Sequence, residues 1–110
     1  MLIIVEEAEN LIKSSQETFG WLASEGRKTG VSMCLVCSRP TDICDTVLSQ
    51  MGTIIMGRTV DSQSLNYLKN VARKTTATLP NLKRGEWIIN GITMRQPTKV
   101  ILRDRFFLHI

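Results

Sequence analysis

The chain has 110 residues, of which 43% are hydrophobic and 22% charged, proportions typical of a soluble globular protein. This length predicts a single domain over residues 1–110. No apolar run approaches the roughly 20 residues of a membrane-spanning helix, and the N-terminus lacks the basic stretch of a secretion signal, so we expect a cytoplasmic protein with no membrane partner.

Positive charge is concentrated in the second half of the chain. The net charge is +4, but residues 1–55 carry 4 Lys and Arg against 7 Asp and Glu, whereas residues 56–110 carry 10 against 3. A basic half is typical of proteins with a phosphate-rich partner, either nucleic acid or nucleotide. Solubility alone would also account for it, so the asymmetry leaves both interpretations open.

The first half of the chain begins with a strand and a helix. Residues 2–5, LIIV, are all apolar and predict a buried strand. Ser14 with Glu17 three residues later matches a capping box, which predicts a helix over about residues 15–29. Gly30 is suited to end that helix.

Residues 31–37, VSMCLVC, predict a second buried strand that contains a CxxC pair, Cys34 and Cys37. Residues three apart on a strand point to opposite faces, so the two thiols should not converge on a metal. We therefore expect two buried structural thiols, and rank a metal or redox protein below the alternatives.

The second half of the chain predicts further elements in alternation. They are a short helix capped by Thr41 or Asp42, a strand at 52–58, a helix at 61–74 capped by Asp61, a loop at 75–85, a hairpin turning at Asn90-Gly91, and a final strand from residue 98. Strand and helix alternate through residue 73, which predicts a mostly parallel sheet with flanking helices, followed by a C-terminal β-hairpin.

Three predicted strands end in side chains that can carry chemistry. Glu6-Glu7 follow the first strand, Ser38-Arg39 the second, and Arg58 the third. In a parallel sheet these ends share one edge, where ligands bind. One carboxylate can then hold Mg²⁺ through water while the other orients a water for attack on a phosphoryl group. Two solvated carboxylates at a strand end are the simpler alternative.

Arg27 and Lys28 also allow two interpretations. They are cations in the last turn of the predicted helix, where they complement its dipole. Alternatively, Arg27 is an arginine finger that reaches the γ-phosphate bound by a neighbouring subunit.

Together these segments resemble the C-terminal half of the HerA-type ATPases, hexameric DNA translocases with a RecA-like core related to the FtsK group. The resemblance extends from Leu2 to about Val100 and is carried by LIIVEEAENLI, by ASEGRKTGVSMCLVCSRP, by the LSQ and strand-end Arg that follow, and by LPNLKRGE at residues 79–86. It implies an α/β fold, a partial RecA-like P-loop NTPase core.

The resemblance implies roles for the residues near the first strand, which corresponds to the Walker B strand of the family. Glu6 corresponds to the position that holds Mg²⁺ through water, and Glu7 to the catalytic glutamate. Arg27 corresponds to the arginine of the family's GRK segment, which is a candidate for acting across a subunit interface.

The same resemblance implies that Ser38 and Arg39 form the sensor and that Arg58 is a nucleotide-binding arginine at a strand end. Two positions depart from the family pattern. Glu9 replaces a histidine, and Ser38 replaces a glutamine and is too short to bridge to a γ-phosphate. Both departures weaken the case for hydrolysis.

No GxxxxGK[ST] phosphate-binding loop occurs in these 110 residues. We therefore expect the chain alone not to hydrolyse ATP and to bind ATP and Mg²⁺, the cofactors of the family, only weakly. A homo-oligomer or a partner chain with a P-loop would complete the site, and DNA would bind the basic second half. The alternative is a non-catalytic relic that serves as a DNA- or protein-binding or oligomerisation module.

The missing loop also has a structural consequence, because the strand that precedes it lies in the middle of the RecA-like sheet. An unfilled sheet edge must be paired or covered. We therefore expect this chain to dimerise, swap or rearrange its sheet, with the apolar tail at 105–110 available for docking. A monomer in analytical ultracentrifugation with the family's strand order would contradict this expectation.

Overall fold

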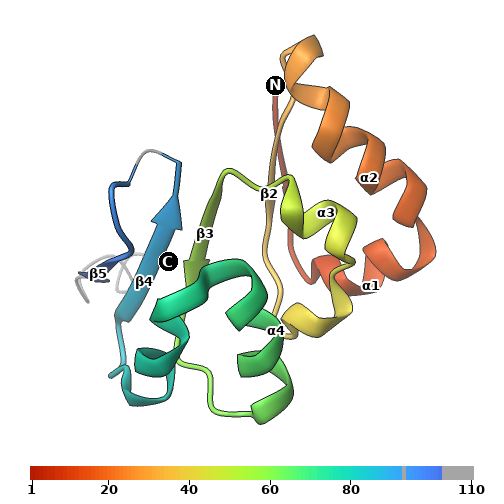
Figure 1. The fold of residues 1–110 in the computed structure, drawn as a ribbon. Coiled ribbons are helices and arrows are strands. Elements are labelled where there is room, and N and C mark those ends of the chain that lie inside the picture. Colours follow the sequence, from red (N-terminus) through yellow and green to blue (C-terminus); the bar gives the residue numbers. More distant parts are fainter. Residues whose placement is uncertain (93, 103–110) are drawn as a thin grey trace, which may run out of the picture. The chain divides into compact units, whose positions relative to one another are not determined.

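The computed structural model describes residues 1–92 and 94–102, so the predicted docking tail at 105–110 lies outside the described residues. The chain divides into two compact units, Met1–Met51 and Gly52–Ile110 (Figure 1). The single domain expected from the chain length stays a prediction.

The first unit is built on two parallel strands, as the apolar runs predict. β1 (Leu2–Val5) pairs with β2 (Ser32–Leu35) from Leu2 opposite Ser32 to Val5 opposite Leu35. The remaining elements of this unit are α1 (Ala8–Ser14), α2 (Gln16–Glu25), the 3-10 turns η1 (Gly26–Thr29) and η2 (Pro40–Asp42), and α3 (Asp45–Ser49).

The core of the first unit lies on one side of this strand pair, where α1, α2 and α3 gather (Figure 1). It contains the buried residues Ala8, Ile12, Ile43 and Val47, with Val5 and Leu35 packed against them from the strands. Burial of these aliphatic side chains, at about 25 cal/mol per Å² of apolar surface, is the main stabilising contribution in this unit.

The opposite face of β1 and β2 is exposed, which corrects the prediction that both strands are buried. Leu2 and Ile4 are each 62% exposed. Cys34 and Cys37 are exposed as well, so the prediction of two buried thiols was wrong. The physical reason is that the described helices of the first unit gather on the other face of the strand pair.

The chain between β1 and β2 forms two helices where the capping box predicted one. Ser14 does not cap a helix, since its hydroxyl donates to the carbonyl oxygen of Leu11 at 3.0 Å. The break falls at Ser15, whose φ of −141° is not helical. The predicted stop is confirmed, because Gly30 follows η1 with a φ of 77°.

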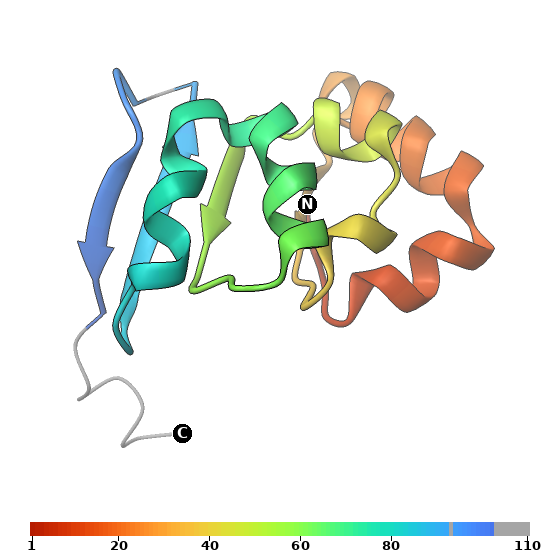
Figure 2. The ribbon, with the colours of Figure 1, turned by 60° about the horizontal axis from the view of Figure 1, so that its bottom comes forward.

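The second unit is an antiparallel sheet of three strands in the order β3 (Thr53–Met56), β4 (Glu86–Gly91) and β5 (Thr98–Ile101). The helix α4 (Ser62–Ala72) and the 3-10 helix η3 (Arg73–Asn81) lie against one face of it (Figure 2). Their shared core consists of Met56, Leu68, Leu79, Leu82 and Ile88.

Two local predictions in this unit were wrong. Asn90 and Gly91 do not form the hairpin turn, because they pair with Ile54 and Thr53 of β3 and so extend β4. The hairpin between β4 and β5 exists, but its connection comes later in the chain. A loop was expected at 75–85, but residues 75–81 belong to η3, and the fully buried Leu79 anchors that segment in the core.

The cap of α4 is confirmed. The Asp61 carboxylate accepts a hydrogen bond from the backbone N–H of Ser64 at 2.9 Å, which satisfies one of the free donors at the helix start. This hydrogen bonding with Ser64 lowers the pKa of Asp61.

The predicted α/β class is confirmed, with a parallel strand pair in the first unit and the C-terminal hairpin in the second. Within the described residues, β2 pairs only with β1 and β3 pairs only with β4, so β2 and β3 each have one unpaired edge. None of the helices that the structure describes has the length and apolar content required to span a membrane.

Candidate functional site

Glu6 and Glu7 form a two-residue turn at the carboxyl end of β1. The turn is held to the end of β2 on both sides, because the Val36 N–H donates to the Val5 carbonyl at 2.9 Å and the Ala8 N–H donates to the Val36 carbonyl at 3.0 Å. Both glutamates are exposed. The turn is therefore attached to the end of β2 while its two carboxylates remain accessible.

The backbone of Glu7 adopts the left-handed conformation, with φ 49° and ψ 44°. Among the described residues, Glu7 is the one non-glycine residue with a positive φ. A side chain other than glycine costs about 1–2 kcal/mol in this region. Strained residues of this kind cluster at functional sites, so the presence of glutamate rather than glycine or asparagine favours a role for its carboxylate.

Ser38 and Arg39 lie at the same edge of the first unit as the Glu6-Glu7 turn. This follows from the parallel pairing of β1 and β2, whose carboxyl ends share an edge. The Arg39 side chain is 64% exposed, and its Nε lies 3.2 Å from Asp42 Oδ2, an ion pair without hydrogen-bond alignment. As expected, Glu6-Glu7 and Ser38-Arg39 thus lie at the same end of the strand pair in the first unit.

A buried carboxylate lies beside this edge. Glu9 is only 4% exposed, and its Oε1 accepts hydrogen bonds from the Ser38 hydroxyl at 2.9 Å and from the Ser38 N–H at 3.4 Å. The Glu9 backbone N–H, the Ser38 donors and the Arg39 charge together hold the pKa of Glu9 below its ordinary value, although burial opposes them. Glu9 is thus a buried, ionised group in contact with the predicted sensor residue.

Arg27 lies at the amino end of the strand pair, whereas Glu7 lies at its carboxyl end. It belongs to η1, which leads into Gly30, and the Gly30 carbonyl accepts a hydrogen bond from the amino group of Met1 at 2.9 Å. The length of β1, roughly 13 Å at 3.3 Å per residue, separates this end from Glu7. Arg27 is exposed and makes no ion pair among the residues that the structure describes.

The remaining predicted residue, Arg58, follows β3 and is exposed. It belongs to the second unit, so the expected convergence of Arg58 with the two clusters of the first unit stays a prediction.

The LPNLKRGE segment, which also lies in the second unit, contributes to the core and to the turn before β4. Leu79 and Leu82 are core residues, and Gly85 has a φ of 82° that favours glycine. The Glu86 carboxylate accepts from the Lys83 N–H at 2.7 Å and pairs with Lys99 Nζ at 2.6 Å, which closes the turn into β4.

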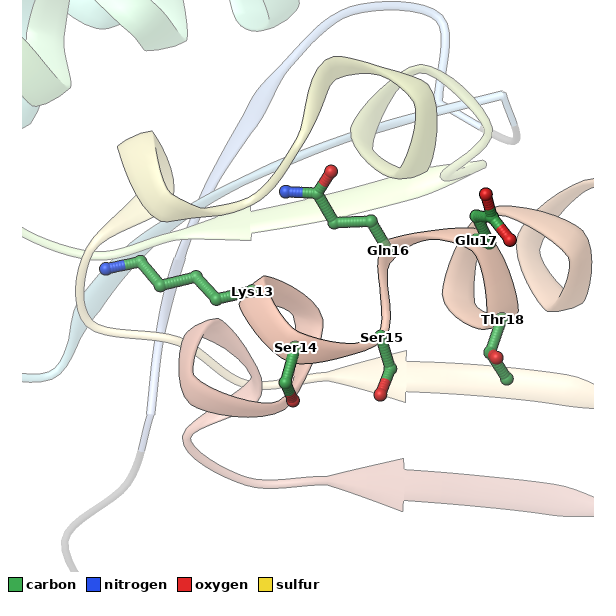
Figure 3. A pocket seen from close by; sticks show the side chains of 6 residues that line it. All are labelled: Lys13, Ser14, Ser15, Gln16, Glu17 and Thr18. Carbon is green, nitrogen blue, oxygen red and sulfur yellow. The ribbon is translucent and has the colours of Figure 1, made fainter.

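Other features of the described residues do not form a site. A shallow hollow of about 430 Å³ is lined by six consecutive residues, Lys13 to Thr18, and none of the predicted site residues lines it. Figure 3 shows the Ser14 and Ser15 hydroxyls pointing away from Gln16, so these groups do not converge on a ligand. In residues 1–92 and 94–102, no group of three or more His, Cys, Asp or Glu is placed to hold a metal ion.

The Glu6-Glu7 turn nevertheless fits a hydrated Mg²⁺. Carboxylate oxygens are the ligands that this ion prefers, and it is typically bound through one or two carboxylates together with waters and phosphates. Neither glutamate is in an ion pair within the described part of the chain, and both are exposed, so both remain available to the ion or to its waters.

The comparisons with known proteins agree with the resemblance noted from the motifs. The chain is 37% identical over 93% of its length to a probable helicase of Methanocaldococcus jannaschii, and 31% identical over 96% to a DNA double-strand break repair helicase HerA of Sulfurisphaera tokodaii. It is homologous to a segment of the HerA-type helicases. The chain spans only 21% and 23% of these two relatives. No protein-family model matches it.

Solved structures confirm the fold. The DNA-packaging ATPase of Sulfolobus turreted icosahedral virus matches 93% of this chain with a TM-score of 0.81 at 19% identity, and the match covers 52% of the viral chain. The genome-packaging NTPase of Sulfolobus turreted icosahedral virus 2, in complex with ATP-gammaS, matches 89% with a TM-score of 0.78 at 18% identity and is covered to 50%. This chain thus has the fold of about half of these two viral NTPase chains.

The sequence patterns missed three residues that organise this edge, namely Glu9, Lys13 and Asp42. Glu9 had been noted only as a departure from the family pattern, and Asp42 only as a helix cap. A usable signal was present, since Glu9 and Lys13 are four apart and therefore share one face of a helix. That signal was lost because the helix was expected to begin after residue 14.

Proposed function

We propose that this chain provides the Walker B, sensor and arginine-finger segments of a HerA-type DNA-translocating ATPase, whose P-loop comes from a segment outside these 110 residues. The observation that carries the proposal is the strained, exposed Glu7 at the carboxyl end of β1, with Ser38 and Arg39 at the same edge. The homology to helicases provides the class of reaction.

In this proposal the two glutamates have different roles. Glu6 holds Mg²⁺ through water, and Glu7 accepts a proton from, and orients, the water that attacks the γ-phosphate. When bound, Mg²⁺ would neutralise negative charge on the transferred phosphoryl group. Arg39 and Arg58 contribute positive charge toward the phosphates. Ser38 stands at the sensor position.

Arg27 acts in a neighbouring subunit of the proposed homo-oligomer. Its place at the edge opposite Glu7 supports this role, because an arginine side chain cannot reach across a separation of roughly 13 Å to its own site. The exposed guanidinium is instead available to the phosphates bound by an adjacent copy.

The open edge and the exposed face of the strand pair support completion by a further segment. Chains that match this one in solved structures are about twice as long as the matched part. A strand bearing the P-loop would pair with the free edge of β2, and the helix that follows such a loop would cover the apolar side chains of Leu2 and Ile4. Alone, the chain would bind ATP weakly and would not turn it over.

ATP turnover after completion tests the proposal. The chain is mixed with, or fused to, the P-loop-bearing half of a HerA-type relative, and phosphate release is measured with and without DNA. We expect turnover only in the completed protein. Stable association without turnover would contradict the catalytic role.

A non-catalytic DNA- or protein-binding module is the second candidate, and the excess of 10 Lys and Arg over 3 Asp and Glu in residues 56–110 favours it. Binding through phosphate contacts weakens steeply as salt rises. A mobility-shift assay of the isolated chain at low and high salt distinguishes this candidate, since an absence of binding at low salt excludes the DNA-binding form.

A further inference from the structure

Glu9 and Ser38 belong to different parts of the first unit and contact each other. Glu9 lies in the first turn of α1, and Ser38 follows β2. A carboxylate that is only 4% exposed requires hydrogen bonds or opposite charge to remain ionised in the interior. The Ser38 hydroxyl at 2.9 Å and its N–H at 3.4 Å meet this need at Oε1, so burial of Glu9 depends on the position of Ser38.

A second contact from the same helix face holds the far end of the same segment. Lys13 lies one helical turn after Glu9, and its Nζ is 3.4 Å from Asp42 Oδ1. The segment Ser38–Asp42 is therefore attached to α1 at its first and last residues. Arg39 lies inside this segment, and its Nε is 3.2 Å from Asp42.

We propose that Glu9 is a positioning residue which, together with Lys13, holds the segment Ser38–Asp42 against α1 and thereby fixes the place of Arg39. The role of Arg39 toward phosphate rests on the proposed function, whereas the attachment of the segment does not. Glu9 and Ser38 act as one pair, because the Glu9 carboxylate of α1 accepts a hydrogen bond from the short Ser38 side chain.

A set of variants at the exposed Ser38 tests the hydrogen bond without disturbing the core. Ser38→Thr keeps the hydroxyl and should retain the urea midpoint of the wild type. Ser38→Val has the shape of threonine without the hydroxyl and should unfold at a lower urea concentration. Equal midpoints for the two variants would overturn the proposed pair.

A double-mutant cycle tests whether Glu9 and Ser38 act together. Glu9→Gln and Ser38→Ala should each lower the midpoint, and the double variant should lose less than the sum of both. Glu17 is exposed on α2, so Glu17→Gln with Ser38→Ala serves as the additive control. Additive losses for Glu9 and Ser38 would overturn the coupling.

The Cys37 thiol provides a readout that a purely packing role of Glu9 would not move. Partial removal from water raises the pKa of Cys37, and the charges of Glu9 and then Asp42 raise it further. In Glu9→Gln, the pH midpoint of Cys37 alkylation should fall, while that of the exposed Cys34 stays unchanged in the same peptide digest. An unchanged Cys37 midpoint would contradict a charged Glu9 at this place.

These measurements use the 110-residue chain without nucleotide. Their failure would refute the positioning role and leave the proposed ATPase function standing, whereas absence of turnover in the completed protein would do the reverse.

Discussion

At the scale of single residues, the conformation of Glu7 is the feature that most needs a functional explanation. A turn between a strand and a helix is commonly made with glycine or asparagine when φ is positive, because glycine has no Cβ to clash. Glu7 keeps its side chain in this conformation at the end of β1, next to a second carboxylate. A functional need for the Glu7 carboxylate at the end of β1 would explain this strain.

Replacing Glu7 by glycine should stabilise the chain. Relief of the left-handed strain outweighs the greater freedom of glycine in the unfolded state, so we expect the free energy of unfolding to rise by about 0.5–1 kcal/mol. Urea denaturation measures this change. Glu6→Gly is the matched control and should lose stability, since Glu6 has no positive φ. A loss in both variants would show that the Glu7 backbone is not strained.

At the scale of elements, the pairing of β4 with β3 depends on a close approach at Gly91. A Cβ built there would lie 2.7 Å from Thr53 Oγ1 and 3.0 Å from the Gly52 carbonyl oxygen. Backbone atoms cannot move aside cheaply, so a side chain at Gly91 would push the two strands apart.

The variant Gly91→Ala should therefore lose about 1–3 kcal/mol of stability. Gly52→Ala is the control, because its Cβ would meet the Ile92 side chain at ordinary distances, 3.6 Å from Cδ1 and 3.9 Å from Cγ1. Thermal unfolding followed by circular dichroism compares the two. A similar melting temperature for both variants would contradict the observed register of β3 and β4.

The same element shows where sequence patterns reached their limit. Asn90-Gly91 is a strong local turn signal, but pairing with β3 places both residues in a strand instead. The break between α1 and α2 at Ser15 was missed because the capping pattern of Ser14 and Glu17 was satisfied by residue type but not by geometry. Long-range pairing and backbone geometry are not visible in short windows.

Other features were predictable because local chemistry determines them. The apolar runs of β1 and β2, the Asp61 cap and the stop at Gly30 follow from residue type alone. The edge shared by Glu7 and Ser38 follows from parallel pairing. Burial of β1 and β2 on both faces was wrong because the pattern of an α/β sheet assumes a complete domain, and the described residues match about half of one.

At the scale of the whole molecule, acid should destabilise the chain through three carboxylates. The pKa values of Glu9, Asp61 and Glu86 are all lowered, first by the Glu9 N–H, by Ser64 and by Lys99 respectively. A lowered folded-state pKa contributes stability above the unfolded value of roughly 4, and that stability is lost as pH falls through the folded-state value.

We therefore expect the urea midpoint to stay level from pH 7 to about 5 and to fall steeply below it. Glu9→Gln should flatten part of that fall, while Glu17→Gln, on the exposed face of α2, should not. A midpoint that stays constant down to about pH 3 would contradict the hydrogen bonding described for these carboxylates.

The exposed apolar face of β1 and β2 and the free edge of β2 are consistent with a chain that is one part of a larger assembly. In that assembly, the strained turn at Glu6-Glu7 would face the phosphates that the P-loop holds. In the proposed function, Glu7 serves the chemical step rather than the binding of nucleotide or the folding of the chain.

The most direct test compares ATP affinity with turnover in the completed protein carrying Glu7→Gln. We expect an ATP dissociation constant close to that of the wild type and a turnover rate that is lower by roughly 10²-fold or more. Glu17→Gln should change neither quantity. Turnover at the wild-type rate in Glu7→Gln would contradict the catalytic role assigned to this turn.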